Sequence, residues 1–591
     1  MTRSEIQSAA NTYIGVERVE DFRVQVEQLL AAEDFTELED RFYTDLEFGT
    51  GGLRGVIGGG SNRMNPFVVQ RATTGLAQYV LEHGVPDAKG RFSAVIAHDS
   101  RRYSKEFALS AALVFAAHGI KAYLFSDLRP TPELSFSVRE LGAATGIVVT
   151  ASHNPPQYNG YKVYWADGSQ VIAPHDQGII RKVRAVKSVQ AMDRAEALEK
   201  GLLQYIDRDL DDKFVAMVKR QSIRHDLLKD RGGEVKAVYT PLHGTGAFMV
   251  ERVLGELGVH VVTVPEQREP DGEFPTVDFP NPEEAGAMEM ALELARKERA
   301  DIVIGTDPDA DRIGIGVPDE RDYRLITGNQ LGVLLVDYIF GSRKELGSLP
   351  DQPVFVKTIV TTDLQRDIAE HFGATVYDTL TGFKHIAAVM RELEKDPDGP
   401  QYVLGDEESY GYLIGTEVRD KDSISATVLT VEMALYHRSR GKSVLDRLNE
   451  IYEQFGYYEE LTISRHFAGM QGKSIMAGLM DTLRGSPGTV FGGRPVERIV
   501  DFQNDTVLDP KTGSTTAGPG LPSSNVLQYV LAGGDKVSMR PSGTEPKIKF
   551  YASCRADAGT PLAEAREVVR QKIEAIEAQI VTLIESVSGE S

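Results

Sequence analysis

The chain of 591 residues has a single cysteine, Cys554, and fewer basic than acidic side chains, 65 against 87. One cysteine excludes an intramolecular disulfide and any metal site built from several cysteines, and Cys554 is expected to be a small buried hydrophobic residue. The net charge of -22 argues against non-specific binding to nucleic acid or to an anionic membrane surface. A phosphate-bearing ligand would therefore need cations focused in one local pocket.

Long hydrophobic runs are also missing. The most apolar stretch, "LGVLLVDYIF", is well short of the roughly 18 residues that a membrane-spanning helix needs. The first residues, "MTRSEIQSAANTYIG", lack the apolar segment of a secretion signal. We therefore expect a cytoplasmic enzyme or binding protein, with no nucleic-acid, membrane or obligate protein partner.

The order of apolar and polar segments predicts several domains. Residues 1–42 have apolar side chains at helical spacing, which indicates an N-terminal helical extension. Strands then alternate with helices in three rounds, which predicts α/β domains over residues 43–215, 216–322 and 323–458. Residues 459–591 contain clustered strands followed by a long helix, so we expect a C-terminal α+β domain.

The first informative loop is "TASHNPPQYNGYKVY", which follows the short apolar strand "GIVVT". The strand delivers Ser152 to the end of a sheet, and the prolines and the Asn-Gly pair predict a shaped loop with a turn. In an extended chain the side chain of His153 would point away from that of Ser152, which disfavours a serine-histidine relay. The G-x-S-x-G pattern of a hydrolase nucleophile is also absent.

The second loop, "GTDPDADR", has aspartates at alternate positions after the apolar strand "DIVI". Alternate side chains of an extended loop fall on one side, so Asp307, Asp309 and Asp311 can converge on a hard cation. A calcium loop would need Gly and Glu where Arg312 and Pro318 stand. The pattern favours Mg²⁺ with open coordination sites, and the alternative is a solvated acidic turn.

Three further loops carry polar groups. In "GDEESYG", Glu407 and Ser409 suit the vicinal hydroxyls of a sugar ring, although a surface turn is an equal alternative. In "RPSGTEPKIK", a fork-shaped cation, hydroxyls and a glycine suit a phosphate that does not react. Arg54 lies in the glycine-rich stretch "FGTGGLRGVIG", which we interpret as a turn. A D-x-D-x-T phosphatase motif is absent, which leaves a phosphate-carrying serine, Mg²⁺, and a sugar with a second phosphate.

In this order and at these separations, the four loops "TASHNPPQYNGYK", "GTDPDADR", "GDEESYG" and "RPSGTEPKIK" resemble the α-D-phosphohexomutase superfamily of phosphoglucomutases and phosphomannomutases. "NRMNP" and "NGYKVYWADGSQVIAPHD" are most similar to the branch of long bacterial phosphoglucomutases and animal phosphopentomutase-like enzymes. The resemblance implies three related mixed-sheet α/β domains and a C-terminal α+β domain around a central cleft. It also implies an isomerase that converts glucose 1-phosphate to glucose 6-phosphate, with mannose or pentose phosphates as alternative substrates and a non-catalytic regulator as a remote alternative.

By the same resemblance, Ser152 is a phosphoserine that binds Mg²⁺ together with the three aspartates, and glucose 1,6-bisphosphate is the intermediate and activator. General acid-base candidates are Lys162 first, then His153 and Lys421. Ser423 stands where the family has Gly after the lysine-aspartate pair, so the sequence departs from the family pattern beside Lys421. Charge stabilisation and substrate binding fall on a larger set of residues: Arg54, Arg312, Thr381, Gly382, Glu407, Ser409, Arg540, Ser542, Gly543, Thr544 and Lys549.

Overall fold

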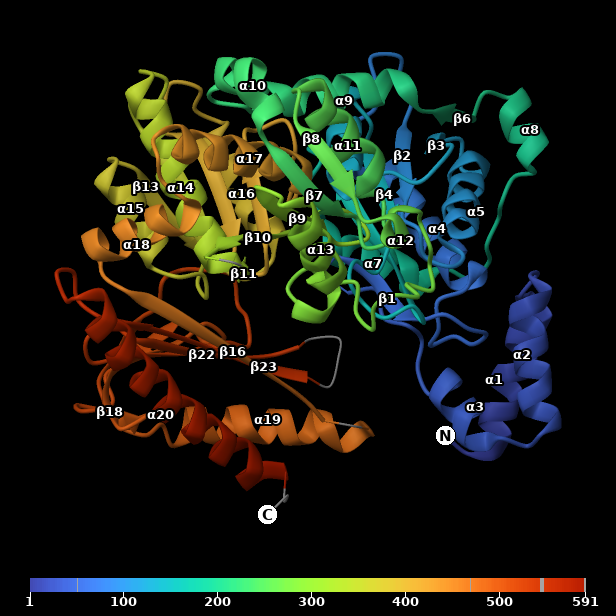
Figure 1. Cartoon of the computed structure of the whole chain (residues 1–591). Coiled ribbons are helices and arrows are strands. Elements are labelled where there is room, and N and C mark those ends of the chain that lie inside the picture. The colour runs from blue at the N-terminus through green and yellow to red at the C-terminus, as the bar shows by residue number, and fades with distance from the viewer. Residues whose placement is uncertain (50, 321, 468, 543–546, 589–591) are drawn as a thin grey trace. The chain divides into compact units, whose positions relative to one another are not determined.

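The computed structural model describes the chain except for residues 50, 321, 468, 543–546 and 589–591 (Figure 1). Two compact units divide it: Met1–Gly328 with Ser409–Ser439, and Asn329–Glu408 with Arg440–Ser591. Each unit is described by itself below. Among the described residues, none of the helices combines the length and the apolar composition that a membrane crossing needs.

The first unit begins with three helices, as the apolar spacing predicts. They are α1 (Arg3–Val16), α2 (Glu20–Ala31) and α3 (Phe35–Phe42). Thr2 and Glu5 form a capping box that fixes the start of α1. Ile6, Tyr13 and Val26 are buried in a small core of their own, so these helices pack as a distinct layer.

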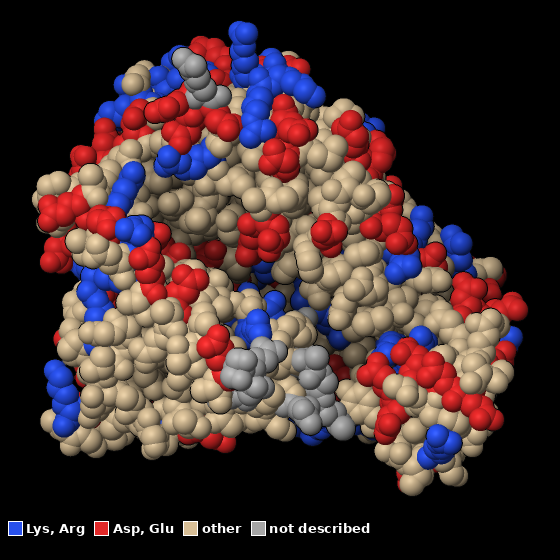
Figure 2. Space-filling view, turned by 60° about the horizontal axis from the view of Figure 1, so that its bottom comes forward, with Lys and Arg blue, Asp and Glu red and all other residues tan. Residues whose placement is uncertain are grey.

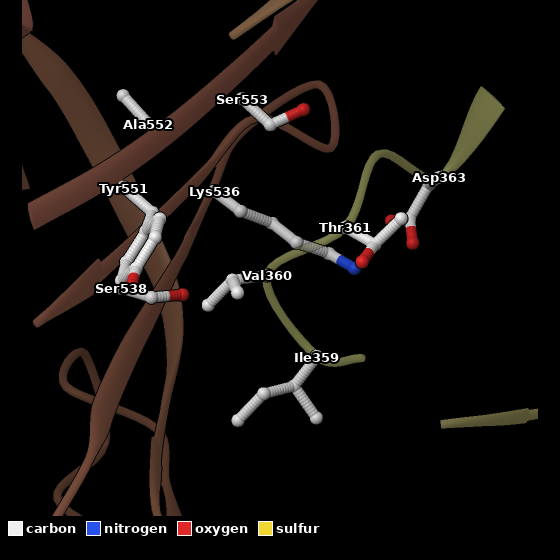
Figure 3. Close-up of a pocket in the computed structure, with 9 residues that line it drawn as sticks. All are labelled: Ile359, Val360, Thr361, Asp363, Lys536, Ser538, Tyr551, Ala552 and Ser553. Atoms are coloured by element: carbon white, nitrogen blue, oxygen red, sulfur yellow. The ribbon is translucent and has the colours of Figure 1, made fainter. Parts of the chain in front are cut away.

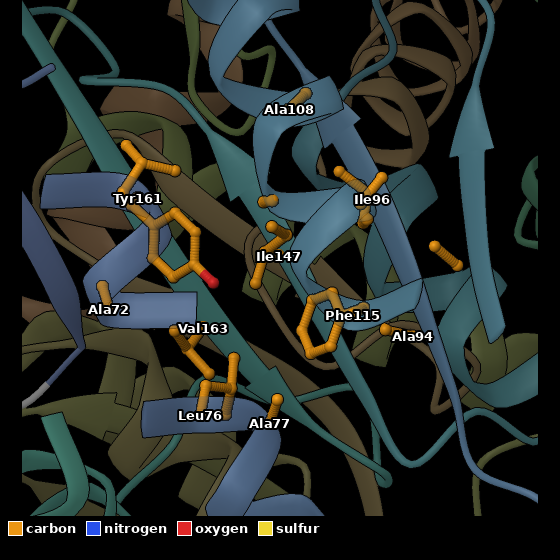
Figure 4. Packing of buried hydrophobic residues seen from close by; sticks show 14 of the residues in the cluster. Ala72, Leu76, Ala77, Ala94, Ile96, Ala108, Phe115, Ile147, Tyr161 and Val163 are labelled. Atoms are coloured by element: carbon orange, nitrogen blue, oxygen red, sulfur yellow. The ribbon is translucent and has the colours of Figure 1, made fainter. Parts of the chain in front are cut away.

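A six-stranded mixed sheet follows, in the order β1-β5-β4-β2-β3-β6. The strands β2, β3, β4 and β6 are parallel, whereas β5 is antiparallel to both β4 and β1. Figure 4 shows part of the apolar core, where Phe115, Ile147 and Val163 are fully buried. The strands are β1 (Gly52–Val56), β2 (Ser93–His98), β3 (Lys121–Phe125), β4 (Thr145–Val149), β5 (Tyr158–Trp165) and β6 (Leu203–Ile206), and the helices are α4 (Pro66–His83), α5 (Ser104–Ala117), α6 (Thr131–Glu140), α7 (His175–Ala185), α8 (Arg194–Glu199) and α9 (Arg208–Arg220).

Two predicted turns in this sheet are wrong. The Asn-Gly pair of the serine loop lies inside β5, and Arg54 lies on the edge strand β1, which pairs with β5. A Cβ atom on Gly160 would lie 2.4 Å from the Thr150 carbonyl oxygen and 2.9 Å from that of Leu53. The glycine therefore permits close approach of three strands instead of forming a turn.

The second sheet has the order β11-β10-β9-β7-β8. Its strand β7 is parallel to β8 and β9, and β10 is antiparallel to β9 and β11. Two later segments of the chain, β15 and α17, also belong to this unit, and α17 packs against α9 and α11. The elements are β7 (Lys236–Thr240), β8 (His260–Thr263), β9 (Ile302–Thr306), β10 (Ile313–Asp319), β11 (Asp322–Ile326), β15 (Gly411–Ile414), α10 (His225–Arg231), a 3-10 turn (Gly232–Glu234), α11 (Gly246–Glu256), α12 (Pro265–Arg268), α13 (Ala285–Glu298) and α17 (Ser423–Ser439).

The second unit contains a third α/β layer and a C-terminal sheet. In the α/β layer, β12 pairs in parallel with β13 and with β14. Its elements are β12 (Pro353–Thr358), β13 (Thr375–Thr379), β14 (Gln401–Glu407), α14 (Gly328–Glu345), α15 (Leu364–His371), α16 (Phe383–Leu393) and α18 (Val444–Phe455).

The C-terminal sheet is antiparallel, in the order β16-β23-β22-β21-β18-β19-β20, with β17 beside β18. The core between this sheet and helices α19 and α20 contains Cys554, which is fully buried as predicted. The elements are β16 (Tyr458–His466), β17 (Val490–Phe491), β18 (Arg494–Asp501), β19 (Thr506–Leu508), β20 (Thr515–Ala517), β21 (Leu527–Leu531), β22 (Lys536–Pro541), β23 (Lys547–Arg555), α19 (Gly469–Gly485) and α20 (Leu562–Ser588).

The predicted fold class is confirmed: three α/β layers with mixed sheets precede a sheet-rich C-terminal domain. The exact domain boundaries and the central cleft stay predictions. On the face that Figure 2 shows, acidic and basic side chains are intermingled, so the negative net charge does not collect there as one patch.

Candidate active site

Ser152 lies just beyond the carboxyl end of β4 and is buried. Its Oγ donates a hydrogen bond of 2.7 Å to Asp307 Oδ2 and lies 3.1 Å from His153 Nδ1. The expectation that these neighbouring side chains point apart is therefore wrong. The physical reason is the backbone of Ser152, which has a φ of 52° and is left-handed rather than extended.

The predicted convergence of the three aspartates is confirmed. Asp307, Asp309 and Asp311 follow β9, are almost completely buried, and place one ligand oxygen each within 4.8 Å of the others. The turn is closed by backbone N–H groups, because Asp307 Oδ1 accepts from Asp311 at 3.1 Å and from Arg312 at 3.0 Å. Ala310 completes the turn in a left-handed conformation, with a φ of 50°.

Two lysines face this acidic loop. Lys162 Nζ lies 2.6 Å from Asp309 Oδ2 and 3.3 Å from Asp311 Oδ2. Lys421 Nζ lies 3.1 Å from Asp311 Oδ2 and 3.2 Å from Asp420 Oδ1. Burial alone would lower the pKa of Lys162, but the neighbouring aspartates outweigh it and raise that pKa above its ordinary value. Lys162 therefore carries a proton and a positive charge at neutral pH.

The aspartates themselves differ in their tendency to ionise. Burial, followed by the charges of Asp309 and Asp311, raises the pKa of Asp307 well above its ordinary value. Burial would also raise the pKa of Asp309, but Lys162 outweighs it and holds that pKa below the usual range. One carboxyl thus favours a proton, and it is the one in contact with Ser152.

The donor set fits a divalent cation. Among the described residues, Asp309 Oδ1 and Asp311 Oδ1 are buried without a hydrogen-bond partner. Unsatisfied carboxylate oxygens are costly to bury, and hard oxygen ligands are those that Mg²⁺ prefers. The aspartate group could therefore bind a metal ion, with the lysines as neighbouring positive charges.

Residues that sequence reasoning did not select support the acidic loop. Thr131, at the start of α6, donates its N–H to the Asp309 carbonyl and its Oγ1 to Asp309 Oδ2, both at 2.9 Å. Ser423 Oγ donates to the Ala310 carbonyl at 2.5 Å. The serine that departs from the family pattern thus holds the same loop that Lys421 contacts. No local pattern in the sequence joins these residues to the acidic loop.

Both predicted arginines of the first unit lie beside these loops. Arg54 Nη1 donates to Asn154 Oδ1 in the serine loop at 3.3 Å. Arg312 Nη1 donates to Glu283 Oε1 at 2.6 Å, and its Nε lies 3.9 Å from Asp311 Oδ1. Ser409 also belongs to the first unit, as the first residue of the segment Ser409–Ser439.

The second unit brings together the other predicted residues that the structure describes. Glu407 Oε1 at the end of β14 accepts the Gly382 N–H at 2.9 Å, and Gly382 has a φ of 116° that favours glycine. Thr381 precedes this glycine, and its Oγ1 is buried. Arg540 on β22 lies directly opposite Lys549 on the neighbouring antiparallel strand β23. The Ser542 N–H donates to the Lys547 carbonyl at 2.7 Å, whereas Gly543 and Thr544 lie outside the described residues.

Glu408 joins the end of β14 to the loop that follows β12. Its Oε2 accepts from Thr358 Oγ1 at 2.9 Å and from Thr361 Oγ1 at 3.3 Å. Burial, with the charge of Glu407, raises the pKa of Glu408 to about 7. The same loop lines a small pocket against β22 and β23, where Lys536 points toward Thr361 and Asp363 (Figure 3).

Comparison with known proteins decides the class of the protein. The phosphoglucomutase/phosphomannomutase alpha/beta/alpha domains I, II and III match residues 45–190, 212–320 and 327–455. The chain belongs to the phosphoglucomutase/phosphomannomutase family. This mutase has a phosphohexomutase-type function and is an isomerase, as the resemblance of its loops implies.

Named relatives cover most of the mutase. It is 36% identical over 517 residues to the "Phosphoglucomutase" of Staphylococcus saprophyticus, and the alignment covers 87% of this chain and 91% of the relative. It is 35% identical to the "Probable phosphoribomutase" of Schizosaccharomyces pombe, with 93% and 94% covered. It is 34% identical to the human "Phosphopentomutase", with 93% and 92% covered.

Solved structures share the fold of the mutase. A putative phosphomannomutase from Thermus thermophilus aligns with a TM-score of 0.64 at 22% identity, covering 91% of this chain and 99% of that chain. The parafusin phosphoglucomutase from Paramecium aligns with a TM-score of 0.67 at 17% identity, covering 93% and 96%. These likenesses concern the fold alone.

Proposed function

We propose that this mutase interconverts glucose 1-phosphate and glucose 6-phosphate through a phosphorylated Ser152 and a glucose 1,6-bisphosphate intermediate. The observation that carries the proposal is the contact of 2.7 Å between Ser152 Oγ and Asp307 Oδ2, which joins the serine loop to the buried aspartates. A phosphoryl group on this oxygen would lie beside Lys162 and the acidic loop, where its charge would be balanced.

In the first transfer, the bond between phosphorus and Ser152 Oγ breaks and a bond to the sugar 6-hydroxyl oxygen forms. The hydroxyl proton passes to a basic side chain, and the serine oxygen receives a proton from an acidic one. Lys162 remains the first choice among the acid-base candidates, as the acid that protonates the departing serine oxygen, because its Nζ is charged and buried at the acidic loop. His153 Nδ1 lies 3.1 Å from Ser152 Oγ, and Lys421 Nζ lies 3.1 Å from Asp311 Oδ2. The neutral form of either side chain can take up the hydroxyl proton.

Asp307, Asp309 and Asp311 would hold Mg²⁺ together with an oxygen of the phosphorylated serine. When bound, the ion would withdraw negative charge from the phosphoryl group. Arg54, from β1, would stabilise charge at the serine loop, and Arg312 would do so at the acidic loop. The protein's own part is to position the serine and to keep both lysines beside the carboxylates.

The remaining predicted residues would bind the substrate. Glu407 and Ser409 would contact ring hydroxyls, with Thr381 and Gly382 as further contacts. The phosphate that does not react would be held by Arg540, Ser542, Gly543, Thr544 and Lys549. The bisphosphate would reorient in the site, so that its second phosphate returns to Ser152 and the product is released. A cytoplasmic location stays a prediction from composition.

Pentose phosphates are the second candidate substrates, because the relatives named phosphopentomutase and phosphoribomutase match over at least 88% of their length at 34% to 35% identity. Mannose 1-phosphate is a third, which the family name suggests. Measured turnover rates for glucose 1-phosphate, mannose 1-phosphate and ribose 1-phosphate, each with its catalytic bisphosphate, would rank these three candidate substrates. A rate for ribose 1-phosphate well above that for glucose 1-phosphate would replace glucose in the proposal.

The phosphoserine scheme is tested by Ser152→Ala. We expect this variant to lose isomerase turnover and the stable incorporation of phosphate from glucose 1,6-bisphosphate, both measured on the purified full chain. Ser137→Ala is the matched control, because Ser137 is buried on α6 and its Oγ has no hydrogen-bond partner among the described residues. Retained turnover in Ser152→Ala would refute the phosphoserine.

A further inference from the structure

Arg101 is a buried arginine close to the serine loop that the proposed chemistry does not use. It lies between β2 and α5, and its side chain is fully shielded from solvent. A buried guanidinium needs acceptors for its five N–H groups, because uncompensated burial of a charge is costly. The identity of those acceptors indicates what Arg101 does.

The acceptors are backbone carbonyls of the serine loop. Arg101 Nη1 donates to the Pro155 carbonyl at 2.9 Å and to the Tyr158 carbonyl at 3.1 Å. Arg101 Nη2 donates to the Ser152 carbonyl at 2.6 Å and also to the Asn154 carbonyl. One planar group thus binds four carbonyls across the seven residues from the serine to the start of β5.

Other hydrogen bonds also hold the loop: the Ser152 N–H donates to Thr150 Oγ1 and the Ile57 N–H donates to the Gln157 carbonyl, both at 2.8 Å. Pro155 and Pro156 have no N–H group to donate. Within the loop, the Asn154 N–H donates to the Ala151 carbonyl and the Tyr158 N–H to the Pro155 carbonyl. Neither bond uses the Ser152 and Asn154 carbonyls, which accept from Arg101. Ser152 is also held in a left-handed conformation that a residue with a side chain rarely adopts unless its surroundings enforce it.

The guanidinium is itself fixed on its other sides. Asp99 Oδ2 lies 3.4 Å from Arg101 Nε, and the ring of Phe274 lies 4.9 Å from the guanidinium carbon. Asp99 is oriented in turn, because its Oδ1 accepts the Arg101 N–H at 2.9 Å and Ser104 Oγ at 2.7 Å. The carboxylate and the ring thus lie against the guanidinium, and its Nη groups face the loop.

We propose that Arg101 is the positioning residue of the serine loop: its guanidinium holds the backbone turn that aims Ser152 Oγ at Asp307. The inference rests on the proposed function for its catalytic meaning. Arg101 contacts backbone rather than the reacting oxygen, so it acts through the geometry of Ser152. A lysine cannot replace it, because one ammonium group has three donors on a single nitrogen and cannot span four carbonyls.

The test compares Arg101→Lys with Arg102→Lys on the full chain. Arg102 is a matched neighbour: its side chain is 44% exposed, it pairs with Glu273 at 3.1 Å, and its Nη2 donates to the Pro156 carbonyl at 3.4 Å. For Arg101→Lys we expect kcat to fall about 100-fold while KM changes by less than about threefold. Arg102→Lys is expected to stay within about threefold of the parent in both constants.

A second readout does not depend on activity. Hydrogen–deuterium exchange of the amides of residues 151–159 is expected to become at least about tenfold faster in Arg101→Lys and to be unchanged in Arg102→Lys. Methylguanidinium is expected to restore part of the kcat of Arg101→Ala, whereas methylammonium is not. If Arg101→Lys does not fold, Asp99→Asn serves instead, with faster exchange expected in the same peptide.

The outcomes separate this inference from the proposed function. Unchanged exchange at residues 151–159, or a kcat of Arg101→Lys within about threefold of the parent, overturns the positioning role. If the parent enzyme has no mutase turnover and takes up no phosphate, the proposed function fails, and the exchange experiment still decides whether Arg101 holds the loop.

Discussion

Two strands of the mutase each have three acidic residues at or just beyond their carboxyl end, and the two sets differ in how their carboxyl groups ionise. After β9 come Asp307, Asp309 and Asp311 at alternate positions, and the last two face Lys162. At the end of β14 come three consecutive acids, residues 406–408. Among the described residues, Glu408 accepts from threonine hydroxyls and Glu407 accepts from a backbone N–H. Both sets follow a buried strand, so burial alone does not distinguish them.

The difference lies in where positive charge is found. Lys162 holds the pKa of Asp309 below its usual range, whereas burial, with the charge of Glu408, raises the pKa of Asp406 well above its ordinary value. A buried carboxyl ionises where a close cation outweighs the loss of hydration, as at Asp309, and favours its proton where it does not, as at Asp307 and Asp406. A metal site is therefore indicated by alternate spacing together with neighbouring cations, rather than by the number of acidic residues.

The largest effect is expected at the alternate set. Asp309→Asn should lower kcat by about 1000-fold, because it removes a charged ligand and the partner of Lys162. Chelation of the parent enzyme should likewise stop turnover, and added Mg²⁺ should restore it. Steady-state rates over a magnesium titration measure both. An enzyme whose rate is indifferent to chelation would contradict the assignment of a metal to this loop.

The second prediction separates catalysis from recognition. Glu407→Ala removes an acceptor of the Gly382 N–H and a proposed sugar contact, so KM should rise by about 10- to 100-fold with a smaller change in kcat. Initial rates over a range of glucose 1-phosphate give the two constants. A fall in kcat as large as that of Asp309→Asn, at constant KM, would contradict the assignment of separate roles to the acids after β9 and those at the end of β14.

The third prediction concerns pH. The pKa of Glu408 is raised from 4.5 to about 7, so the folded state binds this proton more tightly than the unfolded state does. The resulting stabilisation is fully present below pH 4.5 and is lost as the pH rises through about 7. The contribution of Glu408 to the unfolding temperature should therefore fall between about pH 5 and pH 8, and the difference between the parent and Glu408→Gln over that range measures it.

Two comparisons control that experiment. Glu460, whose pKa burial also raises to about 7, keeps its share of the slope in Glu408→Gln. Glu392→Gln changes a highly exposed residue paired with Lys395 and should leave the slope as it is in the parent. A slope unaltered by Glu408→Gln would show that this carboxyl ionises at the same pH in both states.

The smallest effect is expected for Asp406→Asn. Asp406 is fully buried and keeps its proton, so an amide of similar shape replaces a neutral group. Turnover should stay within about threefold of the parent, and the free energy of unfolding should change by less than about 1 kcal/mol. Denaturant unfolding measures the latter. A loss comparable to that of Asp309→Asn would mean that Asp406 is charged in the folded enzyme.

Local sequence predicts one part of this site well. Ser152 and the aspartates each follow an apolar run rich in β-branched residues. Such a run predicts a buried strand, and the residues that follow it are therefore expected at the end of a sheet. The direction of the His153 side chain was not predictable in this way, because the left-handed backbone at Ser152 has no sequence signature. The Asn-Gly pair was misread for a related reason: a glycine that permits close strand packing looks the same as one that forms a turn.

Supporting residues escaped prediction because their partners are distant in the chain. Thr131 is 178 residues from Asp309, and Tyr164 is 256 residues from Asp420, to which its hydroxyl donates at 2.7 Å. Arg101 is 51 residues from Ser152. Such contacts depend on how α6, β5 and the loop after β2 are placed by the sheet, and a motif contains no information on that placement.

The buried cysteine gives the mutase a practical advantage for spectroscopy. Cys554 is fully shielded, and burial raises the pKa of its thiol to about 12, so it is poorly reactive toward maleimides at neutral pH. A cysteine introduced at an exposed site, such as Glu392→Cys, would then be the one thiol that takes a dye or spin label. Pairs of such substitutions can report distances during turnover without first removing a native cysteine.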